Sequence, residues 1–161
     1  MNAFAVLCSG ATRPQVTVAE AMHWGLVSCS SEDSLRAVAA LMSDNRVHCV
    51  VVIDDPSDKH SMWGVVSDHD LVAAATVRSL DEQQAGGSAM KPVVTVAPGE
   101  LLADAAKRMT RLGLSHLVVV DPVEHRPLGV LSTLDLAAML AAAWSPLLGT
   151  NPYFPAPDSR R

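Results

Sequence analysis

The sequence of 161 residues is poor in aromatic residues and in long apolar runs, and both scarcities limit what it can form. Only 4% of the residues are aromatic although 49% are hydrophobic, so a core has to be built from alanine, valine, leucine and methionine. The longest uninterrupted apolar run is Leu136–Trp144, nine residues, whereas a membrane-spanning helix needs roughly 18. The composition therefore predicts a folded protein of small, closely packed elements without a membrane span.

Basic residues and cysteines are scarce as well. Lys and Arg number 12 against 17 Asp and Glu, which gives a net charge of −5. Binding to nucleic acid depends on clustered basic residues, so nucleic acid is disfavoured as a partner. Cys8, Cys29 and Cys49 form neither a CxxC pair nor a disulfide framework. We interpret the chain as a reduced, cytoplasmic protein with buried thiols, and a redox switch through Cys29 and Cys49 stays open as an alternative.

An internal repeat organises the chain. The stretch 28–54 aligns with 95–121 at a shift of 67 positions, and 64–71 aligns with 129–136 at a shift of 65. Each copy has the pattern of a short strand, an amphipathic helix, a fully apolar strand, a strand containing a glycine, and a second helix. The repeat predicts an α/β (α+β) protein made of two β-α-β-β-α units.

The repeat also divides the chain. We expect an N-terminal extension at 1–14, the first repeat at 15–78, a connecting helix with the second repeat at 79–143, and a Pro-rich tail at 144–161. In the connection, Ser79 and Glu82 have the spacing of a capping box, which predicts a short helix ended by Gly86-Gly87. Because one unit cannot bury both faces of its strands alone, the copies should pack about a pseudo-twofold axis with binding crevices between them.

The repeated motifs resemble those of the CBS domain, present here as the tandem pair called a Bateman module. Both copies carry a valine-rich strand that precedes an Asp, then G-V-[VL]-S-x-x-D-L at 64–71 and 129–136, and the resemblance covers about 16–143. It implies a regulatory, non-enzymatic module that needs no cofactor and binds AMP, ADP, ATP or S-adenosylmethionine in clefts between the repeats. It also implies a homodimer, built on the helices at 71–75 and 136–143, that signals to an unknown effector protein.

Site residues follow from the resemblance by motif position. Asp70 and Asp135 would accept hydrogen bonds from ribose hydroxyls, while Ser67 and Ser132 would stand at helix starts that favour phosphate. The backbone around two further segments of each copy would line the adenine pockets. These residues are Val27, Ser28, Val47, His48 and Cys49 in the first copy, and Val94, Thr95, Leu114, Ser115 and His116 in the second.

The two clefts are not expected to be equivalent. The position before the ribose aspartate is often basic in the family, but it is His69 in the first copy and Leu134 in the second. We expect the first copy to hold phosphate better, and more weakly above about pH 6.5, where a free histidine loses its proton. The second copy would take a less charged ligand or stay empty.

Other interpretations of the same residues stay open. S-x-x-D is also a capping-box pattern, in which the aspartate bonds to the cap N–H and no ligand is involved. The chain would then be a ligand-free dimerisation or interaction module. A redox or metal sensor using Cys29, Cys49 and the histidines is a third interpretation, although no metal ligand set or nucleophile motif is present in the sequence. In the tail, Trp144, Tyr153 and Phe154 either fray or pack on a partner subunit.

Overall fold

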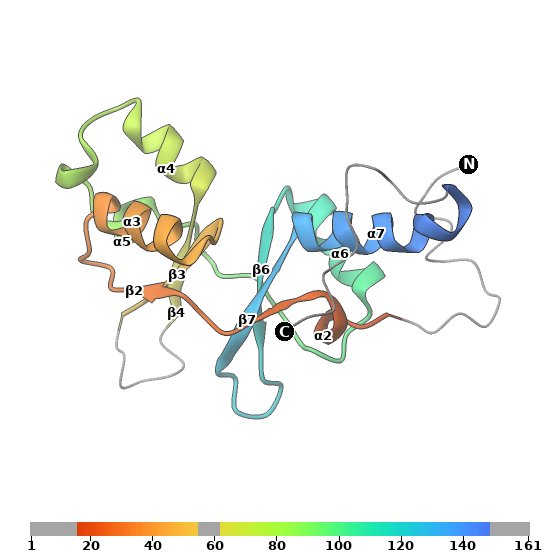
Figure 1. Ribbon diagram of the computed structural model, residues 1–161. Coiled ribbons are helices and arrows are strands. Elements are labelled where there is room, and N and C mark those ends of the chain that lie inside the picture. The colour runs from red at the N-terminus through yellow and green to blue at the C-terminus, as the bar shows by residue number, and fades with distance from the viewer. Residues whose placement is uncertain (1–15, 55–61, 149–161) are drawn as a thin grey trace.

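The computed structural model describes residues 16–54 and 62–148 (Figure 1). Cys8, the predicted N-terminal extension, and the side chains of Trp144, Tyr153 and Phe154 lie outside the described part. No helix within it is both long and apolar enough to cross a membrane. The elements in chain order are α2 (Val18–Ala21), β1 (His23–Trp24), β2 (Ser28–Cys29), α3 (Leu35–Asn45), β3 (Cys49–Ile53), β4 (Met62–Ser67), α4 (Asp68–Ala75), the 3₁₀ helix η1 (Leu80–Glu82), α5 (Ala85–Ser88), β5 (Thr95–Val96), α6 (Leu102–Leu112), β6 (His116–Val120), β7 (Pro127–Ser132) and α7 (Thr133–Leu148).

Two sheets repeat the same arrangement. In the first, β3 pairs in parallel with β2 and antiparallel with β4; in the second, β6 pairs in parallel with β5 and antiparallel with β7. The registers are equivalent, because Cys49 lies opposite Ser67 and His116 lies opposite Ser132. The predicted α+β class and the two β-α-β-β-α repeats are confirmed. The second sheet also has a fourth strand, β1, at the edge of β7, which the sequence analysis did not predict.

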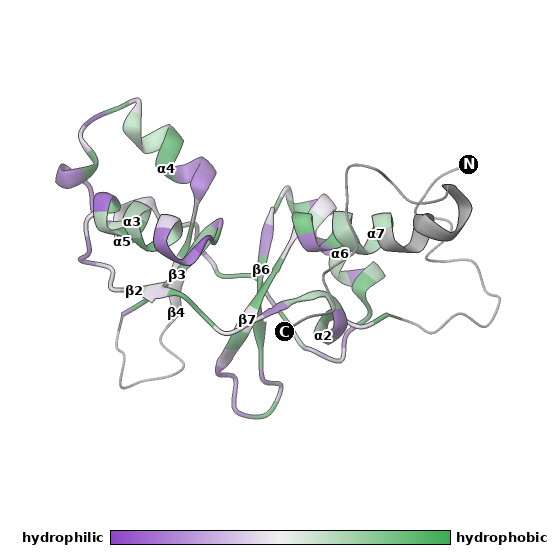
Figure 2. Ribbon diagram, in the orientation of Figure 1, coloured by the Kyte–Doolittle hydropathy of each residue, from purple (hydrophilic) through white to green (hydrophobic). Residues whose placement is uncertain are grey.

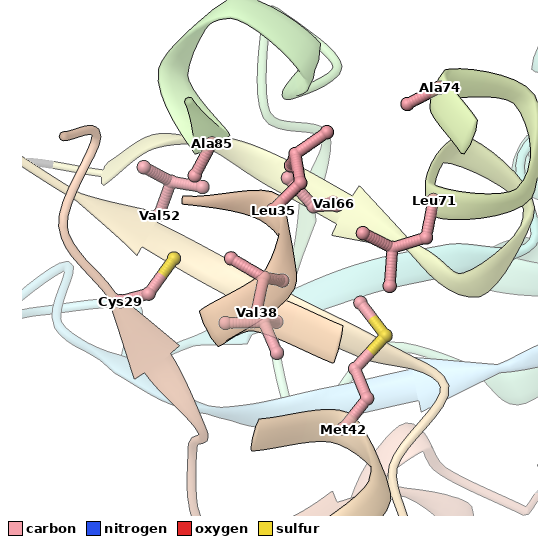
Figure 3. Close-up of a cluster of buried hydrophobic side chains, with 10 residues drawn as sticks. Cys29, Leu35, Val38, Met42, Val52, Val66, Leu71, Ala74 and Ala85 are labelled. Atoms are coloured by element: carbon pink, nitrogen blue, oxygen red, sulfur yellow. The ribbon is translucent and has the colours of Figure 1, made fainter. Parts of the chain in front are cut away.

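The apolar strands β3 and β6 are buried on both faces, as predicted. In β3, Val50 and Val52 point into a cluster with α3 and α4 (Figure 3), while Val51 points to the other face. In β6, Val119 contributes to a cluster on the outer face and Val118 to the inner face. The inner cluster joins the two units, and its buried members are Cys49, Val51, Val65, Val118 and Val120. Figure 2 shows hydrophobic residues along much of β6 and β7.

The segments that precede β2 and β5 are exchanged between the two units. The helix α2 and strand β1 precede β2 in the first repeat, yet β1 pairs with β7 and Val18 is buried in the core of the second unit. The helix α5 precedes the second repeat, yet Ala85 is buried in the core of the first unit and Met90 forms a bridge with Val65. Isolated bridges also join residue 17 to 101 and residue 34 to 84, which are equivalent positions in the repeat. The exchange therefore follows the pseudo-twofold relation of the two units.

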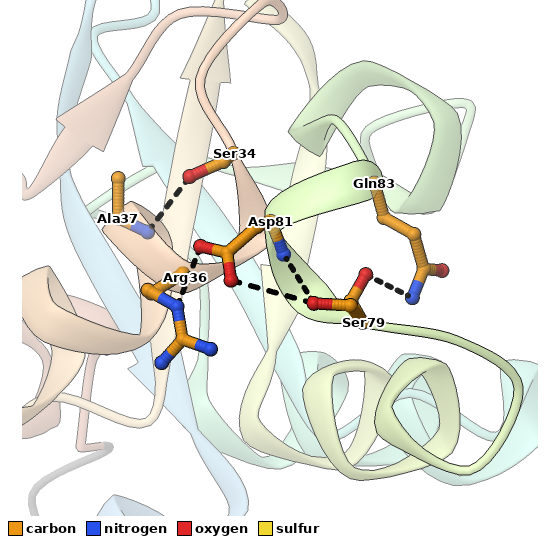
Figure 4. Close-up of polar contacts among 6 residues, drawn as sticks. All are labelled: Ser34, Arg36, Ala37, Ser79, Asp81 and Gln83. Carbon is orange, nitrogen blue, oxygen red and sulfur yellow. Dashed lines mark hydrogen bonds and ion pairs between the residues drawn. The ribbon is translucent and has the colours of Figure 1, made fainter.

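The connection between the repeats is held against the first unit (Figure 4). Arg36 on α3 donates a hydrogen bond from Nε to Oδ1 of Asp81 in η1, at 2.5 Å. The side-chain amide of Gln83 donates to the carbonyl of Ser79 and to other carbonyls at the end of α4. The predicted end of the connecting helix at Gly86-Gly87 is wrong, because Gln83 is already extended and these glycines lie inside α5.

Two glycines make room for the exchanged segments. A Cβ on Gly64 of β4 would stand 2.6 Å from Cβ of Ala89 and 3.0 Å from the carbonyl oxygen of Met90. A Cβ on Gly129 of β7 would overlap the carbonyl oxygen of His23. The glycine of each G-V-[VL]-S motif is thus required by close backbone approach.

Substitution of these glycines should destabilise the fold. We expect Gly64→Ala and Gly129→Ala each to lower the free energy of unfolding by about 1–3 kcal/mol, because the added methyl group meets backbone atoms that are fixed by sheet pairing. Urea denaturation followed by circular dichroism measures the change. Gly87→Ala is the matched control, since a Cβ there meets nothing within 4 Å. Equal stability of all three variants would show that the exchanged segments do not pack as described.

Candidate functional site

A cleft of about 620 Å³ lies between the two units. It is located at the N-terminal ends of the helices α4 and α7 and of the strands β3 and β6. The repeat places equivalent residues of both copies around it, because each S-x-x-D motif ends a central strand and opens a helix. The lining residues are His48, Val65, Ser67, Asp68, His69, Asp70, Met90, Gly113, Leu114, Ser115, His116, Ser132, Thr133 and Leu134.

The cleft brings together about half of the residues expected from the sequence. Those that line it are His48, Ser67, His69, Asp70, Leu114, Ser115, His116 and Ser132. Those that lie outside its lining are Val27, Ser28, Val47, Cys49, Val94, Thr95 and Asp135. The carbonyls of Val27 and Val94 accept hydrogen bonds from Val51 and Val118, so this backbone extends the sheets.

Several lining residues were missed by the sequence analysis. Asp68 and Thr133 begin their helices directly after the predicted serines, so their position next to a predicted site residue was the available signal. Met90 reaches the cleft only because its segment is exchanged between the units. Gly113 ends α6 with a φ of 66°. Neither Met90 nor Gly113 carries a local signal of a binding site.

Both S-x-x-D motifs form capping boxes. Oδ2 of Asp70 accepts hydrogen bonds from the backbone N–H of Ser67 at 2.8 Å and from its hydroxyl at 2.7 Å. Oδ2 of Asp135 accepts the equivalent bonds from Ser132, both at 2.7 Å. The capping interpretation is therefore geometrically correct in both copies. It uses only one oxygen of each carboxylate.

The second carboxylate oxygen distinguishes the copies. Oδ1 of Asp135 lies 2.8 Å from Nδ1 of His23, and the Asp135 side chain is only 6% exposed. Oδ1 of Asp70 has no hydrogen-bond partner among the described residues, and Asp70 lines the cleft. The difference comes from the exchanged segments, because the position equivalent to His23 is Met90, whose side chain has no hydrogen-bond donor. Asp70 can accept a hydrogen bond from a ligand, whereas Asp135 already has an imidazole partner.

Acidic and imidazole groups set the electrostatics of the cleft. Nδ1 of His48 lies 2.8 Å from Oδ2 of Asp68, and this hydrogen bond lowers the pKa of Asp68 below its ordinary value. The pKa of His116 is lowered chiefly by burial, against the opposing effect of nearby carboxylates that include Asp68 and Asp70. The imidazole of His116 is therefore neutral at neutral pH.

The two described cysteines are buried, and their thiols are expected to react slowly. Burial raises the pKa of Cys29 to about 11 and that of Cys49 to about 12. Cys29 pairs with Val52, three residues along β3 from Cys49, so their Cα atoms are separated by about 10 Å, beyond disulfide range. The described residues also contain no cluster of three His, Cys, Asp or Glu side chains able to hold a metal ion. The geometry does not favour the redox or metal interpretation.

Comparison with known proteins identifies the repeats. The CBS domain family profile matches residues 18–76 and 87–142, which together make up more than half of the chain. An uncharacterized protein of Methanocaldococcus jannaschii is 25% identical over 89 residues, which are 55% of this chain and 31% of that protein. The chain thus spans less than a third of that relative.

Solved structures have the same fold. The CBS domain pair of the protein MJ0100, in complex with 5′-methylthioadenosine and S-adenosyl-L-methionine, superposes with a TM-score of 0.71 at 16% identity, covering 81% of this chain and 99% of that one. A CBS domain protein of Pyrobaculum aerophilum complexed with AMP has a TM-score of 0.67 at 29% identity, covering 80% and 98%.

Thiol labelling tests the burial of the two cysteines. We expect Cys29 and Cys49 to resist iodoacetamide at about pH 8 in the folded protein, because the raised pKa values lower the thiolate fraction roughly 100-fold or more. Peptide mass spectrometry measures the labelling, and the same protein in urea is the control in which both should react. Rapid labelling of the native protein, or a Cys29–Cys49 disulfide after mild oxidation, would restore the redox interpretation.

Proposed function

Because the chain belongs to the CBS domain family, we propose that the cleft between its repeats binds an adenosine-containing ligand and that the chain is a regulatory, non-catalytic module. The observation that carries this proposal is Oδ1 of Asp70 on the cleft wall, which has no hydrogen-bond partner in the described part of the chain. A carboxylate oxygen is a strong acceptor for a ribose hydroxyl. The AMP bound to the Pyrobaculum aerophilum protein, at 29% identity, supports a ligand of this type.

Apolar side chains beside Asp70 suit an adenine ring. Val65, Met90 and Leu114 line the same cleft and come from β4, from the exchanged segment, and from the turn before β6. A flat, mostly apolar ring packs well on a flexible thioether and on branched aliphatic groups. In this arrangement, Asp70 orients the ribose while the adenine contacts both units.

Contact with both units offers a route for signalling. A ligand between α4 and the turn before β6 stabilises one relative position of the units, because it binds only when both walls are in place. We propose that a partner protein responds to this change. The location we propose is the cytoplasm, which the two unpaired thiols support. A ligand-free interaction module is the second candidate, because both capping boxes are complete without a ligand.

Titration calorimetry tests the ligand site. We expect one adenosine-type ligand per chain, because Oδ1 of Asp135 is already bound to the imidazole of His23. Asp70→Asn should weaken binding at least about tenfold, which is the loss expected for one hydrogen bond to a charged acceptor. Asp135→Asn is the matched control, because it alters the same capping box in the other copy; its affinity should stay within about twofold of wild type.

Two results would contradict this proposal in different ways. Equal losses in the two variants would show that the copies bind equivalently. The absence of binding for adenosine, AMP and S-adenosylmethionine would favour the ligand-free module. Thermal unfolding of each variant shows whether the fold is intact, since a ligand that binds the native state raises its stability.

We also propose that two copies associate through α4 and α7. Val72 on α4 is 68% exposed and Val77, which follows it, is 73% exposed, so this part of the molecule presents uncovered apolar side chains. We expect a dimer mass in light scattering after gel filtration, and Val72→Lys should shift it toward the monomer. Val123→Lys is the matched control, because Val123 is 83% exposed in the loop between β6 and β7. A monomeric wild-type protein would contradict the proposal.

A further inference from the structure

The cleft carries permanent negative charge without permanent positive charge. Asp68 and Asp70 line it, and no Lys or Arg is among its lining residues in the described part of the chain. Lys91, next to the lining residue Met90, is directed elsewhere: its Nζ lies 3.6 Å from the centre of the Trp63 ring. Among the described residues that line the cleft, a bound anion would meet carboxylates and no Lys or Arg.

The other polar rings of the cleft are imidazoles, which carry no permanent positive charge. His48 is already engaged, because its Nδ1 lies 2.8 Å from Oδ2 of Asp68. Burial lowers the pKa of His116, which keeps this ring uncharged at neutral pH. His69 is exposed at the start of α4. Near pH 7, a free imidazole is largely neutral.

The start of α4 has no N–H group left for a phosphate. The backbone N–H of Asp68 donates to the carbonyl of His48 at 2.9 Å, and that of His69 donates to Oδ1 of Asp68 at 2.8 Å. The backbone N–H of Asp70 donates to the Ser67 hydroxyl at 3.3 Å. Two acidic side chains, Asp68 and Asp70, already interact with the positive end of this helix dipole. A phosphate would have to displace them.

We propose that the ligand of this cleft has no phosphate at its 5′ position: it is an adenosine nucleoside whose 5′ substituent is neutral or cationic, such as a thioether or a sulfonium. This inference rests on the proposed adenosine site. It reverses the expectation that Ser67 and His69 make the first copy a phosphate site, because the donors of Ser67 and α4 are already used. A sulfonium would be attracted by the same carboxylates that repel a phosphate.

Calorimetric titrations of adenosine, 5′-methylthioadenosine and AMP test the inference at fixed ionic strength. At about pH 8 we expect both nucleosides to bind at least about tenfold more tightly than AMP, because the phosphate dianion lies beside two carboxylates. At about pH 5.5 the difference should narrow, because the phosphate takes up a proton and loses one of its two negative charges. The titratable groups that line the cleft are His48 before β3, Asp68, His69 and Asp70 on α4, and His116 on β6. Asp135 and its partner His23 lie outside the lining but close enough for Asp135 to act on the charge of His116.

A charge substitution provides the second measurement. His69→Arg should tighten AMP by about tenfold and leave adenosine within about twofold, because it supplies the fixed cation that the cleft lacks. Val123→Arg is the matched control, because it adds the same charge on an exposed loop outside the cleft lining. It should change neither affinity.

The outcomes separate this inference from the proposed function. If no adenosine compound binds, the proposed function fails. If nucleosides bind but AMP binds as tightly or more tightly at about pH 8, the proposed function stands and this inference is overturned. It is overturned as well if His69→Arg leaves AMP affinity unchanged, since the 5′ substituent would then not face α4.

Discussion

The structure depends on two strands that must be buried on both faces. Every residue of β3 and β6 is apolar apart from the first residue of β6, and alternate side chains enter an outer core and the inner cluster shared by the two units. Complete burial of one valine contributes about 1.5–3 kcal/mol, so a unit that exposed Val51 or Val118 would lose a large part of its stability. The units therefore form one fold, and the cleft lies where these paired strands begin.

The exchanged segments give a symmetric backbone an asymmetric site. The same close approach over Gly64 and Gly129 brings Met90 to one copy and His23 to the other. A thioether leaves the neighbouring carboxylate oxygen open, whereas an imidazole occupies it. The backbone geometry is equivalent in the two copies, but one places Met90 and the other places His23 at this position. This difference explains why Asp135 has an imidazole partner and Asp70 does not.

Local sequence patterns were sufficient to predict the repeated elements, although they misplaced the end of the connecting helix. The repeat, the fully apolar strands and the helix starts at Asp68 and Thr133 were predicted correctly, because periodicity and capping spacing are local properties. The strand β1 has two residues and no periodicity, so its pairing with β7 could not be predicted. The contact of His23 with Asp135 joins positions far apart in the sequence and depends on the exchange. The same long-range origin explains why Met90 was missed.

Capping and ligand binding are compatible uses of one aspartate. In the capping box, Oδ2 of Asp70 accepts hydrogen bonds from the N–H and the hydroxyl of Ser67. These two bonds fix the orientation of the carboxylate group and therefore also the position of Oδ1. A group already ordered in the free protein loses little conformational entropy when a ligand arrives. The capping hydrogen bonds therefore order Oδ1 of Asp70 as an acceptor before any ligand binds. The Ser67 donors and the N–H groups of His69 and Asp70 all have partners within this turn, so the interactions that order Asp70 for the proposed ribose contact also disfavour a phosphate beside it.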